Sequence, residues 1–221
     1  MSELQYVRSH GYALCKRSQA LGEIARGQEC LAVSGTHGKT TTSTLLAHIL
    51  TASGEGCSAF LGGISKNYDT NLLLSRNPVL VAEADEFDRS FLQLNPAIAV
   101  VTATDADHLD IYNDRSHLLE AFGQFAAQVS EAVIVKAGVG LPLDKVSARV
   151  YRYSYDTPCD FYASDIVALE GGKFDFTLNS PMGRFPHWSV GIPGWVNVEN
   201  AVAASAVALL HGVEPEVECC L

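Results

Sequence analysis

A short glycine-containing segment, Val-Ser-Gly-Thr-His-Gly-Lys-Thr-Thr-Thr at Val33–Thr42, constrains the fold of this chain more than any other feature. It follows the apolar run Cys30–Ser34, which is typical of a buried strand, and it leads into Lys39–Ala52, where leucine and isoleucine recur with helical periodicity. Glycines let the backbone approach phosphate oxygens closely, and the first amides of the following helix point at the ligand. A strand, this loop and a helix in that order therefore predict binding of a nucleoside triphosphate.

The glycine spacing departs from the usual G-x-x-x-x-G-K-[ST] pattern, because Val33 stands where the first glycine of that pattern would be. The loop is therefore shorter than the common one. We expect Lys39 to reach the β- and γ-phosphates and the hydroxyl of Thr40 to ligate Mg²⁺. The alternative is a glycine turn that caps a helix and binds nothing. The residues expected to contact the nucleotide are Gly35, Thr36, His37, Gly38, Lys39, Thr40 and Thr41.

Further along the chain, short apolar runs alternate with helical patterns. Such alternation predicts an α/β fold with a mostly parallel, doubly wound sheet, which binds ligands at the carboxyl ends of its strands. We expect a leading helix within Ser2–Gly27. The other expected elements of this part are strands at Pro78–Ala82, Ala97–Thr102 and Ala132–Lys136 and a helix at Ser116–Val129.

The pattern changes after Arg149. Val150–Tyr155 and Asp160–Asn179 show strand-like alternation, and Gly171-Gly172 marks a turn between two strands. These segments predict a small antiparallel β extension of the α/β domain. An alanine-rich helix is expected at Val196–His211, after the break at Pro193-Gly194.

The composition limits the partners of the chain. Fifteen basic and 25 acidic residues give a net charge of −10, which disfavours non-specific binding to nucleic acid or to anionic lipid. The six cysteines include no C-x-x-C pair, so a zinc or redox site is not predicted. The cysteines are scattered, and the N-terminus has no apolar secretory segment. The apolar runs are too short to span a bilayer. Together these features indicate a cytoplasmic protein.

Four motifs in order resemble the Mur ligases, ATP-dependent enzymes that build the peptide of bacterial cell-wall precursors. The first is the loop Gly35–Thr42, and the second is Glu-Ala-Asp-Glu-Phe-Asp at Glu83–Asp88. The third is Thr-Ala-Thr-Asp-Ala-Asp-His-Leu-Asp-Ile-Tyr at Thr102–Tyr112, and the fourth is Pro-Gly-Trp-Val-Asn-Val-Glu-Asn-Ala at Pro193–Ala201. Within the family, the first two motifs look most like the members that join L-alanine to UDP-N-acetylmuramate. Members that recycle murein tripeptide onto the same sugar nucleotide are a near alternative.

The resemblance implies catalytic roles for Lys39, Glu83 and His108. In the family a carboxylate is activated as an acyl phosphate, which an amine then attacks. Lys39 would neutralise charge on the transferred phosphoryl group, and Thr40 with Glu83 would hold Mg²⁺, which prefers hard oxygen ligands. His108 would contribute to a second metal, although imidazole is an unusual Mg²⁺ ligand and a hydrogen-bonding role is the alternative. Glu83 could also be an ordinary solvated carboxylate at a strand end.

Asn197 and Asn200 match the asparagines at the start of the family's nucleotide-binding helix. Their amides could pair with the edge of adenine, or they could simply cap the helix. The family often has a histidine before the first asparagine, and Val196 stands there in this chain. By resemblance, the segment from Gly62 to Asn71 lies near the muramoyl end of the substrate, with a surface loop as the alternative. His37 could contact phosphate or the sugar substrate, or merely fill the loop.

Mur ligases have three domains, and the resemblance aligns this chain with the central one. Residues 1–28 are expected to be a linker or leading helix from an N-terminal domain, and residues 29–221 the ATP-binding domain, without the C-terminal ligase domain. On this basis we expect Mg·ATP binding and little ligation by the 221 residues alone. A P-loop regulatory switch that binds nucleotide without ligating is the alternative from another class, and the shortened loop with Glu83 and His108 disfavours it.

Overall fold

The computed structural model of the chain describes residues 2–105 and 115–215. The helices are α1 (Glu3–Ser9), α2 (Arg17–Ala25), α3 (Lys39–Ala52), η1 (Phe87–Gln93), α5 (Arg115–Ala127), η2 (Glu170–Gly172) and α6 (Trp195–His211), where η marks a 3-10 helix. The strands are β1 (Glu29–Ser34), β2 (Ser58–Ser65), β3 (Thr70–Leu73), β4 (Val79–Ala84), β5 (Ile98–Val101), β6 (Ala132–Lys136), β7 (Arg149–Ser154), β8 (Phe161–Ala168), β9 (Phe174–Ser180) and β10 (Gly183–Val190).

The strands form one sheet in the order β10-β9-β8-β7-β6-β5-β1-β4-β2-β3. Each adjacent pair within the run β8-β7-β6-β5-β1-β4-β2 is parallel, and β3 pairs antiparallel with β2, which confirms the predicted mostly parallel α/β fold. β1 lies at the centre, between β4 and β5, so the carboxyl ends of these three strands meet where the strand order reverses. Open α/β sheets bind ligands at such a point.

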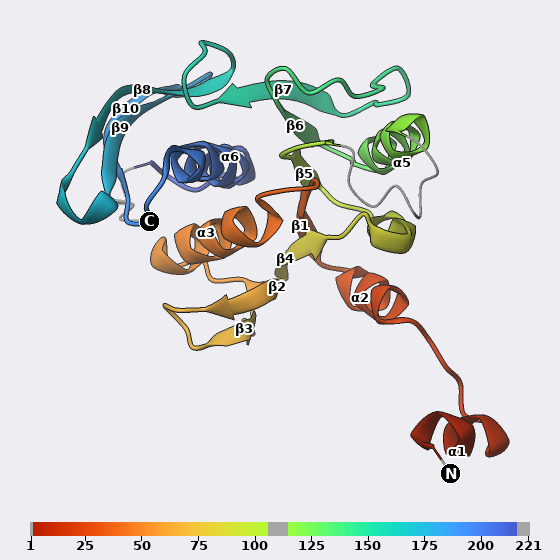
Figure 1. The fold of residues 1–221 in the computed structure, drawn as a ribbon. Coiled ribbons are helices and arrows are strands. Elements are labelled where there is room, and N and C mark those ends of the chain that lie inside the picture. The colour runs from red at the N-terminus through yellow and green to blue at the C-terminus, as the bar shows by residue number, and fades with distance from the viewer. Residues whose placement is uncertain (1, 106–114, 216–221) are drawn as a thin grey trace.

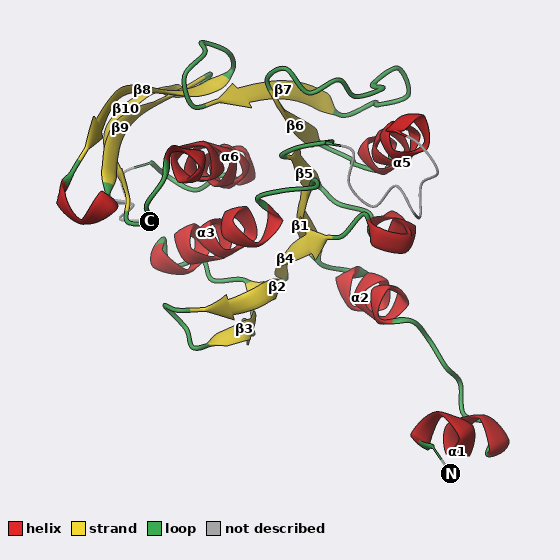
Figure 2. Ribbon diagram, in the orientation of Figure 1, coloured by secondary structure: helices red, strands yellow, loops and turns green. Residues whose placement is uncertain are grey.

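Both faces of the central strands are covered by helices (Figures 1 and 2). α3 and α6 lie on one face, and α2, η1 and α5 lie on the other. β1 shows why, because Leu31 and Val33 belong to the apolar core under α3 and α6, whereas Cys30 and Ala32 belong to the core under α5. Alternate residues of a strand point to opposite faces, so a continuous apolar run fits a strand buried on both sides.

The predicted β extension is present, and it is continuous with the main sheet. β9 runs antiparallel to both β8 and β10, and β8 pairs in parallel with β7, at Tyr153 with Phe161. The predicted glycine turn joins β8 to β9, where Gly171 and Gly172 have φ of +77° and +78°. The extension curls over α6, as Figure 1 shows. It therefore encloses the last helix instead of forming a separate unit.

The expectation of one leading helix is wrong in detail. The segment forms two short helices, α1 and α2, and Gly11 stands between them with φ of +73°. α1 has no buried residue, so burial against the rest of the domain does not favour one longer helix that runs into α2. Figure 1 shows α1 well separated from the sheet, while α2 lies beside η1.

The far end of α6 is fixed by a histidine. His211 is largely buried, and its Nδ1 and Nε2 lie 2.8 Å from Glu29 Oε1 and 3.2 Å from Glu55 Oε2. The ring therefore lies between two carboxylates that come from different segments of the chain. The contacts tie α6 to the start of β1 and to the turn after α3.

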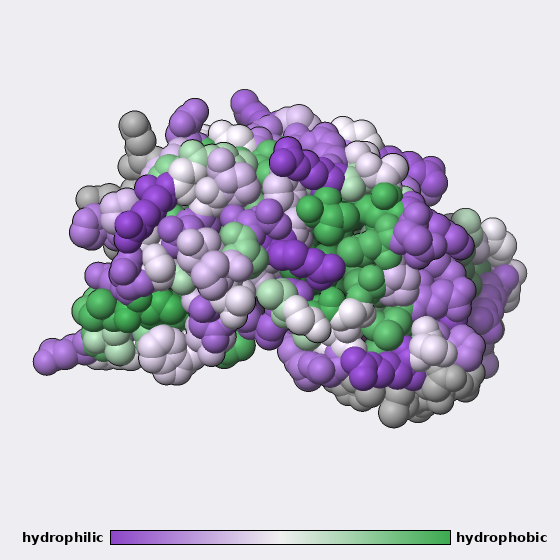
Figure 3. Space-filling model, turned by 90° about the horizontal axis from the view of Figure 1, so that it is seen from above, coloured by the Kyte–Doolittle hydropathy of each residue, from purple (hydrophilic) through white to green (hydrophobic). Residues whose placement is uncertain are grey.

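The surface seen from above is mainly hydrophilic, with some apolar areas between the polar ones (Figure 3). Within residues 2–105 and 115–215, no helix is both long enough and apolar enough to cross a membrane.

Candidate nucleotide-binding site

The glycine loop joins the end of β1 to the start of α3, as predicted. Gly35 has φ of +130°, and a Cβ on it would lie 2.2 Å from Thr102 Oγ1 and 2.7 Å from the backbone nitrogen of Ala103. Thr36 N–H donates to Ala103 O at 3.0 Å. The loop is therefore seated directly on the end of β5, and only glycine allows this approach.

The second glycine forms the turn into the helix. Gly38 is the N-cap of α3 with φ of +82°, and no side chain caps that helix end. A Cβ on Gly38 would lie 2.8 Å from Asn200 Oδ1, so this side of the loop is closed by α6. A helix start without a side-chain cap presents N–H groups and the positive end of the helix dipole, which suits an anion such as phosphate.

Lys39 lies under the loop in contact with a carboxylate. Its Nζ donates to Gly35 O at 2.7 Å and lies 2.9 and 3.1 Å from the two carboxylate oxygens of Glu86. The Lys39 side chain is 14% exposed and that of Glu86 is fully buried. Sequence reasoning assigned no role to Glu86, although it lies inside the Glu83–Asp88 motif. The signal available in the sequence was that this motif has two glutamates three positions apart, Glu83 and Glu86, near the end of a strand.

Thr40 and Glu83 are 43 positions apart in the sequence and meet in the structure. The Thr40 hydroxyl donates to the Glu83 carboxylate at 3.0 and 3.1 Å, and Gly62 N–H donates to Glu83 Oε2 at 2.7 Å. A Cβ on Gly62 would lie 2.3 Å from that same oxygen. Glycine at this position therefore allows β2 to support the carboxylate. The hydroxyl and carboxylate oxygens are the hard donors that Mg²⁺ accepts alongside water and phosphate oxygens.

No group of three or more metal-ligating side chains of His, Cys, Asp or Glu gathers anywhere in the described part of the chain. His108, the third residue predicted to bind metal, lies outside the described residues, together with Asp107 and Asp110.

Asn197 and Asn200 form a hydrogen-bonded series that connects α6 to α3. Thr42 Oγ1 donates to Asn200 Oδ1 at 3.3 Å, Asn200 Nδ2 donates to Asn197 Oδ1 at 3.1 Å, and Asn197 Nδ2 donates to Pro193 O at 2.7 Å. All three side chains are buried. Neither asparagine is the N-cap, which is Gly194. The capping alternative is therefore wrong, and the amides hold the start of α6 against the helix that begins at the loop.

Glu199 fixes the same end of α6 to the sheet. Its Oε2 lies 2.8 Å from Lys136 Nζ at the end of β6, and the Glu199 side chain is 10% exposed. Burial, with a smaller contribution from the charge of Glu199, raises the pKa of the neighbouring Tyr153 phenol well above its ordinary value. The carboxylate therefore takes its positive partner from Lys136, and Tyr153 stays neutral.

The remaining loop residues differ in exposure. The His37 side chain is 66% exposed, and its Nε2 lies 3.9 Å from Asp105 Oδ2. Thr36 is buried, and its Oγ1 accepts from Asp105 N–H at 3.1 Å. Thr41 is half-buried in the first turn of α3. Thr36 thus helps to fix the loop, whereas the ring of His37 faces solvent and does not fill the loop interior.

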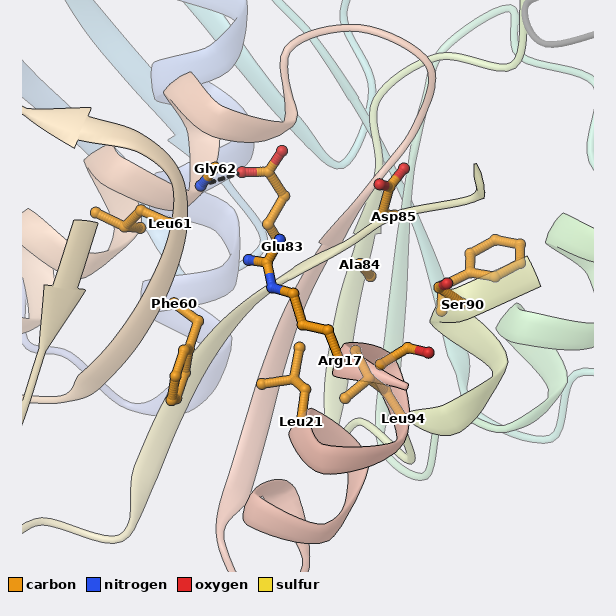
Figure 4. Close-up of a pocket in the computed structure, with 12 residues that line it drawn as sticks. Arg17, Leu21, Phe60, Leu61, Gly62, Glu83, Ala84, Asp85, Ser90 and Leu94 are labelled. Atoms are coloured by element: carbon orange, nitrogen blue, oxygen red, sulfur yellow. Dashed lines mark hydrogen bonds between the residues drawn. The ribbon is translucent and has the colours of Figure 1, made fainter. Parts of the chain in front are cut away.

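A pocket of about 290 Å³ opens beside Glu83 (Figure 4). Gly62 and Glu83 lie at one end, and Arg17 of α2 extends across it toward Glu83. From the Gly62–Asn71 segment, Gly62 lines this pocket, while Thr70 and Asn71 belong to β3 at the sheet edge. The full lining is Arg17, Ser18, Leu21, Phe60, Leu61, Gly62, Glu83, Ala84, Asp85, Ser90, Phe91 and Leu94.

Comparison with known protein families gives a match over most of the chain. The Mur ligase middle domain matches residues 33–208, which include the loop, Glu83 and the start of α6.

Two curated proteins of similar sequence carry the same name. A UDP-N-acetylmuramate–L-alanine ligase from Porphyromonas gingivalis is 46% identical over 220 residues, which cover 97% of this chain and 48% of the relative. One from Phocaeicola vulgatus is 47% identical over 218 residues, covering 97% and 47%. The chain therefore spans about half the length of the curated relatives it matches.

Solved structures show the same fold. The UDP-N-acetylmuramate–alanine ligase of Thermotoga maritima superimposes with a TM-score of 0.82 at 24% identity, over 98% of this chain and 50% of that one. A UDP-N-acetylmuramate:L-alanyl-γ-D-glutamyl-meso-diaminopimelate ligase from Neisseria meningitides gives 0.80 at 25% identity, over 98% and 72%. The arrangement of strands around the loop is thus one that solved ligases share.

Proposed function

Because the chain belongs to the Mur ligase family, we propose that it is the ATP- and Mg²⁺-binding part of a ligase that joins L-alanine to UDP-N-acetylmuramate. The observation that carries this proposal is that Thr40, which follows Lys39 in the loop, meets Glu83, which lies 43 positions further along the sequence. The identity of 46–47% to curated L-alanine ligases supports L-alanine as the amine.

The nucleotide fits the residues at the loop. Gly35 and Gly38 let the loop pack against the end of β5 and against Asn200, where a Cβ would clash, and the start of α3 has no side-chain cap. Lys39 neutralises charge on the β- and γ-phosphates, and the N–H groups of the first turn donate to their oxygens. Asn197 and Asn200 hold α6 beside the loop as part of the nucleotide site.

Thr40 and Glu83 would hold Mg²⁺ through the hydroxyl and carboxylate oxygens that meet there, and His108 is proposed as the further metal ligand. The metal supplies neutralisation of phosphate charge. In the proposed reaction, a carboxylate oxygen of UDP-N-acetylmuramate attacks the γ-phosphorus and ADP leaves. The amine of L-alanine then attacks the acyl carbon of the acyl phosphate, and inorganic phosphate leaves.

The pocket beside Glu83 is the proposed place for the carboxylate-bearing end of the sugar nucleotide. The guanidinium of Arg17 provides a positive charge across the pocket, and Leu21, Phe60 and Leu94 provide apolar surface. Gly62 joins this pocket to the Mg²⁺ ligands through its hydrogen bond to Glu83. These contacts support the assignment of the Gly62–Asn71 segment to the muramoyl end of the substrate.

The exposure of α1 supports a division of the chain at residue 28. Within residues 1–28, α1 contributes nothing to the core and would link the ATP-binding domain, residues 29–221, to another part of the enzyme, whereas α2 packs on the sheet through Ala25. The sugar nucleotide and ATP are cytoplasmic metabolites, so we place the protein in the cytoplasm.

Calorimetric titration with Mg·ATP tests the nucleotide site. The unmodified chain should bind, and Lys39→Ala should weaken binding about 10- to 100-fold, because a hydrogen bond to a charged group contributes about 1.5–3 kcal/mol. Lys145→Ala, which removes an exposed lysine between β6 and β7, is the matched control. Equal affinity in the Lys39 and Lys145 variants would remove the role given to Lys39.

A further inference from the structure

The contact between Lys39 and Glu86 has no part in the roles given above. Glu86 is fully buried, and removing a carboxylate from water is costly unless a positive charge and hydrogen bonds replace the water. Lys39 supplies that positive charge, and its Nζ contacts the two carboxylate oxygens at 2.9 and 3.1 Å. The exposed Lys16–Asp88 ion pair nearby, with side chains 69% and 55% exposed, has no comparable burial.

The ammonium of Lys39 is held at three points. It has three N–H donors, and within the described part of the chain it donates to the two Glu86 oxygens and to Gly35 O. One acceptor therefore belongs to the glycine loop and two belong to the turn after β4. An unrestrained lysine would lose side-chain entropy on binding phosphate, at a cost of about 2 kcal/mol. Lys39 is already ordered by its three contacts, so it avoids part of this cost.

The backbone around Glu86 is fixed by its own hydrogen bonds. Asp85 Oδ1 accepts from Phe87 N–H at 3.2 Å, and Asp85 O accepts from Phe91 N–H at 2.9 Å. Glu86 O accepts from Arg89 N–H at 3.0 Å. The carboxylate therefore projects inward from a tight turn and is itself held in place.

We infer that Glu86 is the positioning residue for Lys39, an assignment that rests on the proposed nucleotide site. The carboxylate holds the ammonium beneath the loop before nucleotide arrives. When the triphosphate binds, Lys39 exchanges its contact with Gly35 O for a phosphate oxygen and keeps Glu86 as its counter-charge. The loop carbonyl is the exchangeable acceptor because it is a neutral group on the phosphate side, whereas the Glu86 carboxylate is buried and bidentate.

A double-mutant cycle of Glu86→Gln and Lys39→Ala tests this inference. Calorimetric titration of the 221-residue chain with Mg·ATP should show a loss of about tenfold in Glu86→Gln, since one neutral acceptor replaces two charge-assisted contacts. In the Lys39→Ala background the same change should cause no further loss, because Glu86 acts through Lys39. Glu86→Asp, which keeps the charge, should recover part of the affinity.

Asp88→Asn is the matched control, because it removes a nearby carboxylate that is exposed and pairs with Lys16. Circular dichroism establishes that each variant is folded, and if Glu86→Gln does not fold then Glu86→Asp serves in the cycle. Unchanged or tighter binding in Glu86→Gln would overturn the inference, as would an equal loss in the Lys39→Ala background. Recovery at high Mg²⁺ concentration would also overturn it, because Glu86 would then act through the metal. No binding by the unmodified chain would instead refute the proposed function.

Discussion

Replacing Thr42 by valine tests whether α6 is held to the loop helix by the hydrogen bonds described above. The Thr42 hydroxyl is buried and donates to the buried Asn200 Oδ1 at 3.3 Å. Valine has a similar shape but no donor, so the change leaves the Asn200 oxygen without this partner in the interior. The helix itself should be unaffected, because threonine and valine have similar helix propensities.

The expected size of the effect follows from the geometry. A buried acceptor left without its partner costs about 1–3 kcal/mol. The separation of 3.3 Å is longer than the usual range for two oxygens, about 2.5–3.0 Å, so the lower part of that range applies. The added methyl group of valine returns part of the loss through burial. We therefore expect a destabilisation of about 1 kcal/mol, and a fall in Tm of about 2–4 °C for a chain of this size.

Thermal unfolding followed by circular dichroism measures this shift. The matched control is Thr44→Val on the same helix, because the Thr44 hydroxyl donates to Thr40 O within the helix, at 2.7 Å, and its loss leaves no buried partner. We expect the control to change Tm by less than about 2 °C. Equal shifts in the two variants, or none in Thr42→Val, would refute the idea that this hydrogen bond joins α3 to α6.

Three further predictions concern other parts of the molecule. Gly62→Ala should keep the fold but displace the Glu83 carboxylate, because the new Cβ would lie 2.3 Å from one of its oxygens. Calorimetry should then show Mg·ATP binding weakened about tenfold. Unchanged affinity would contradict the support that β2 gives to Glu83. His211→Gln should lower Tm by about 2–5 °C, since the single amide nitrogen of glutamine does not span the two carboxylates that the two ring nitrogens contact, and a Tm equal to that of the unmodified chain would argue against this contact. Burial raises the pKa of the Cys30 thiol to about 12 and that of the Cys57 thiol to about 11, so both thiols stay protonated at pH 8. Peptide mapping after maleimide treatment should therefore find the two cysteines labelled only in denaturant.

The sequence was sufficient to predict the parts of the site that depend on local order. The loop, the helix from Lys39 to Ala52 and the strand before it follow one another directly, so periodicity and glycine positions locate them. The meeting of Thr40 with Glu83 was expected from the resemblance to the Mur ligases, and it agrees with the position of Glu83 near the carboxyl end of β4, beside β1. The break between α1 and α2 was missed because neither segment has a strong periodic pattern.

Contacts that depend on burial could not be predicted. Nothing in the local sequence distinguishes Glu86, which is buried, from the exposed carboxylates on either side of it, because the difference arises from the turn into η1. The asparagines of α6 suggested a helix cap or a nucleotide contact, and only the packing of α6 on α3 shows that Thr42 is their partner. The continuity of the β extension with the main sheet depends on the parallel pairing of β7 with β8, which alternation cannot reveal.

The contact between Thr42 and Asn200 also determines when the site can exist during synthesis. The two residues are 158 positions apart, so at about 5–20 residues per second the ribosome reaches Asn200 roughly 8–30 s after Thr42. During that interval the residues of the loop have been synthesised, but α6, which closes the loop at Gly38, has not. At the proposed nucleotide site, ATP would therefore stabilise the finished domain, but it would have no complete site through which to assist the folding of the nascent N-terminal half.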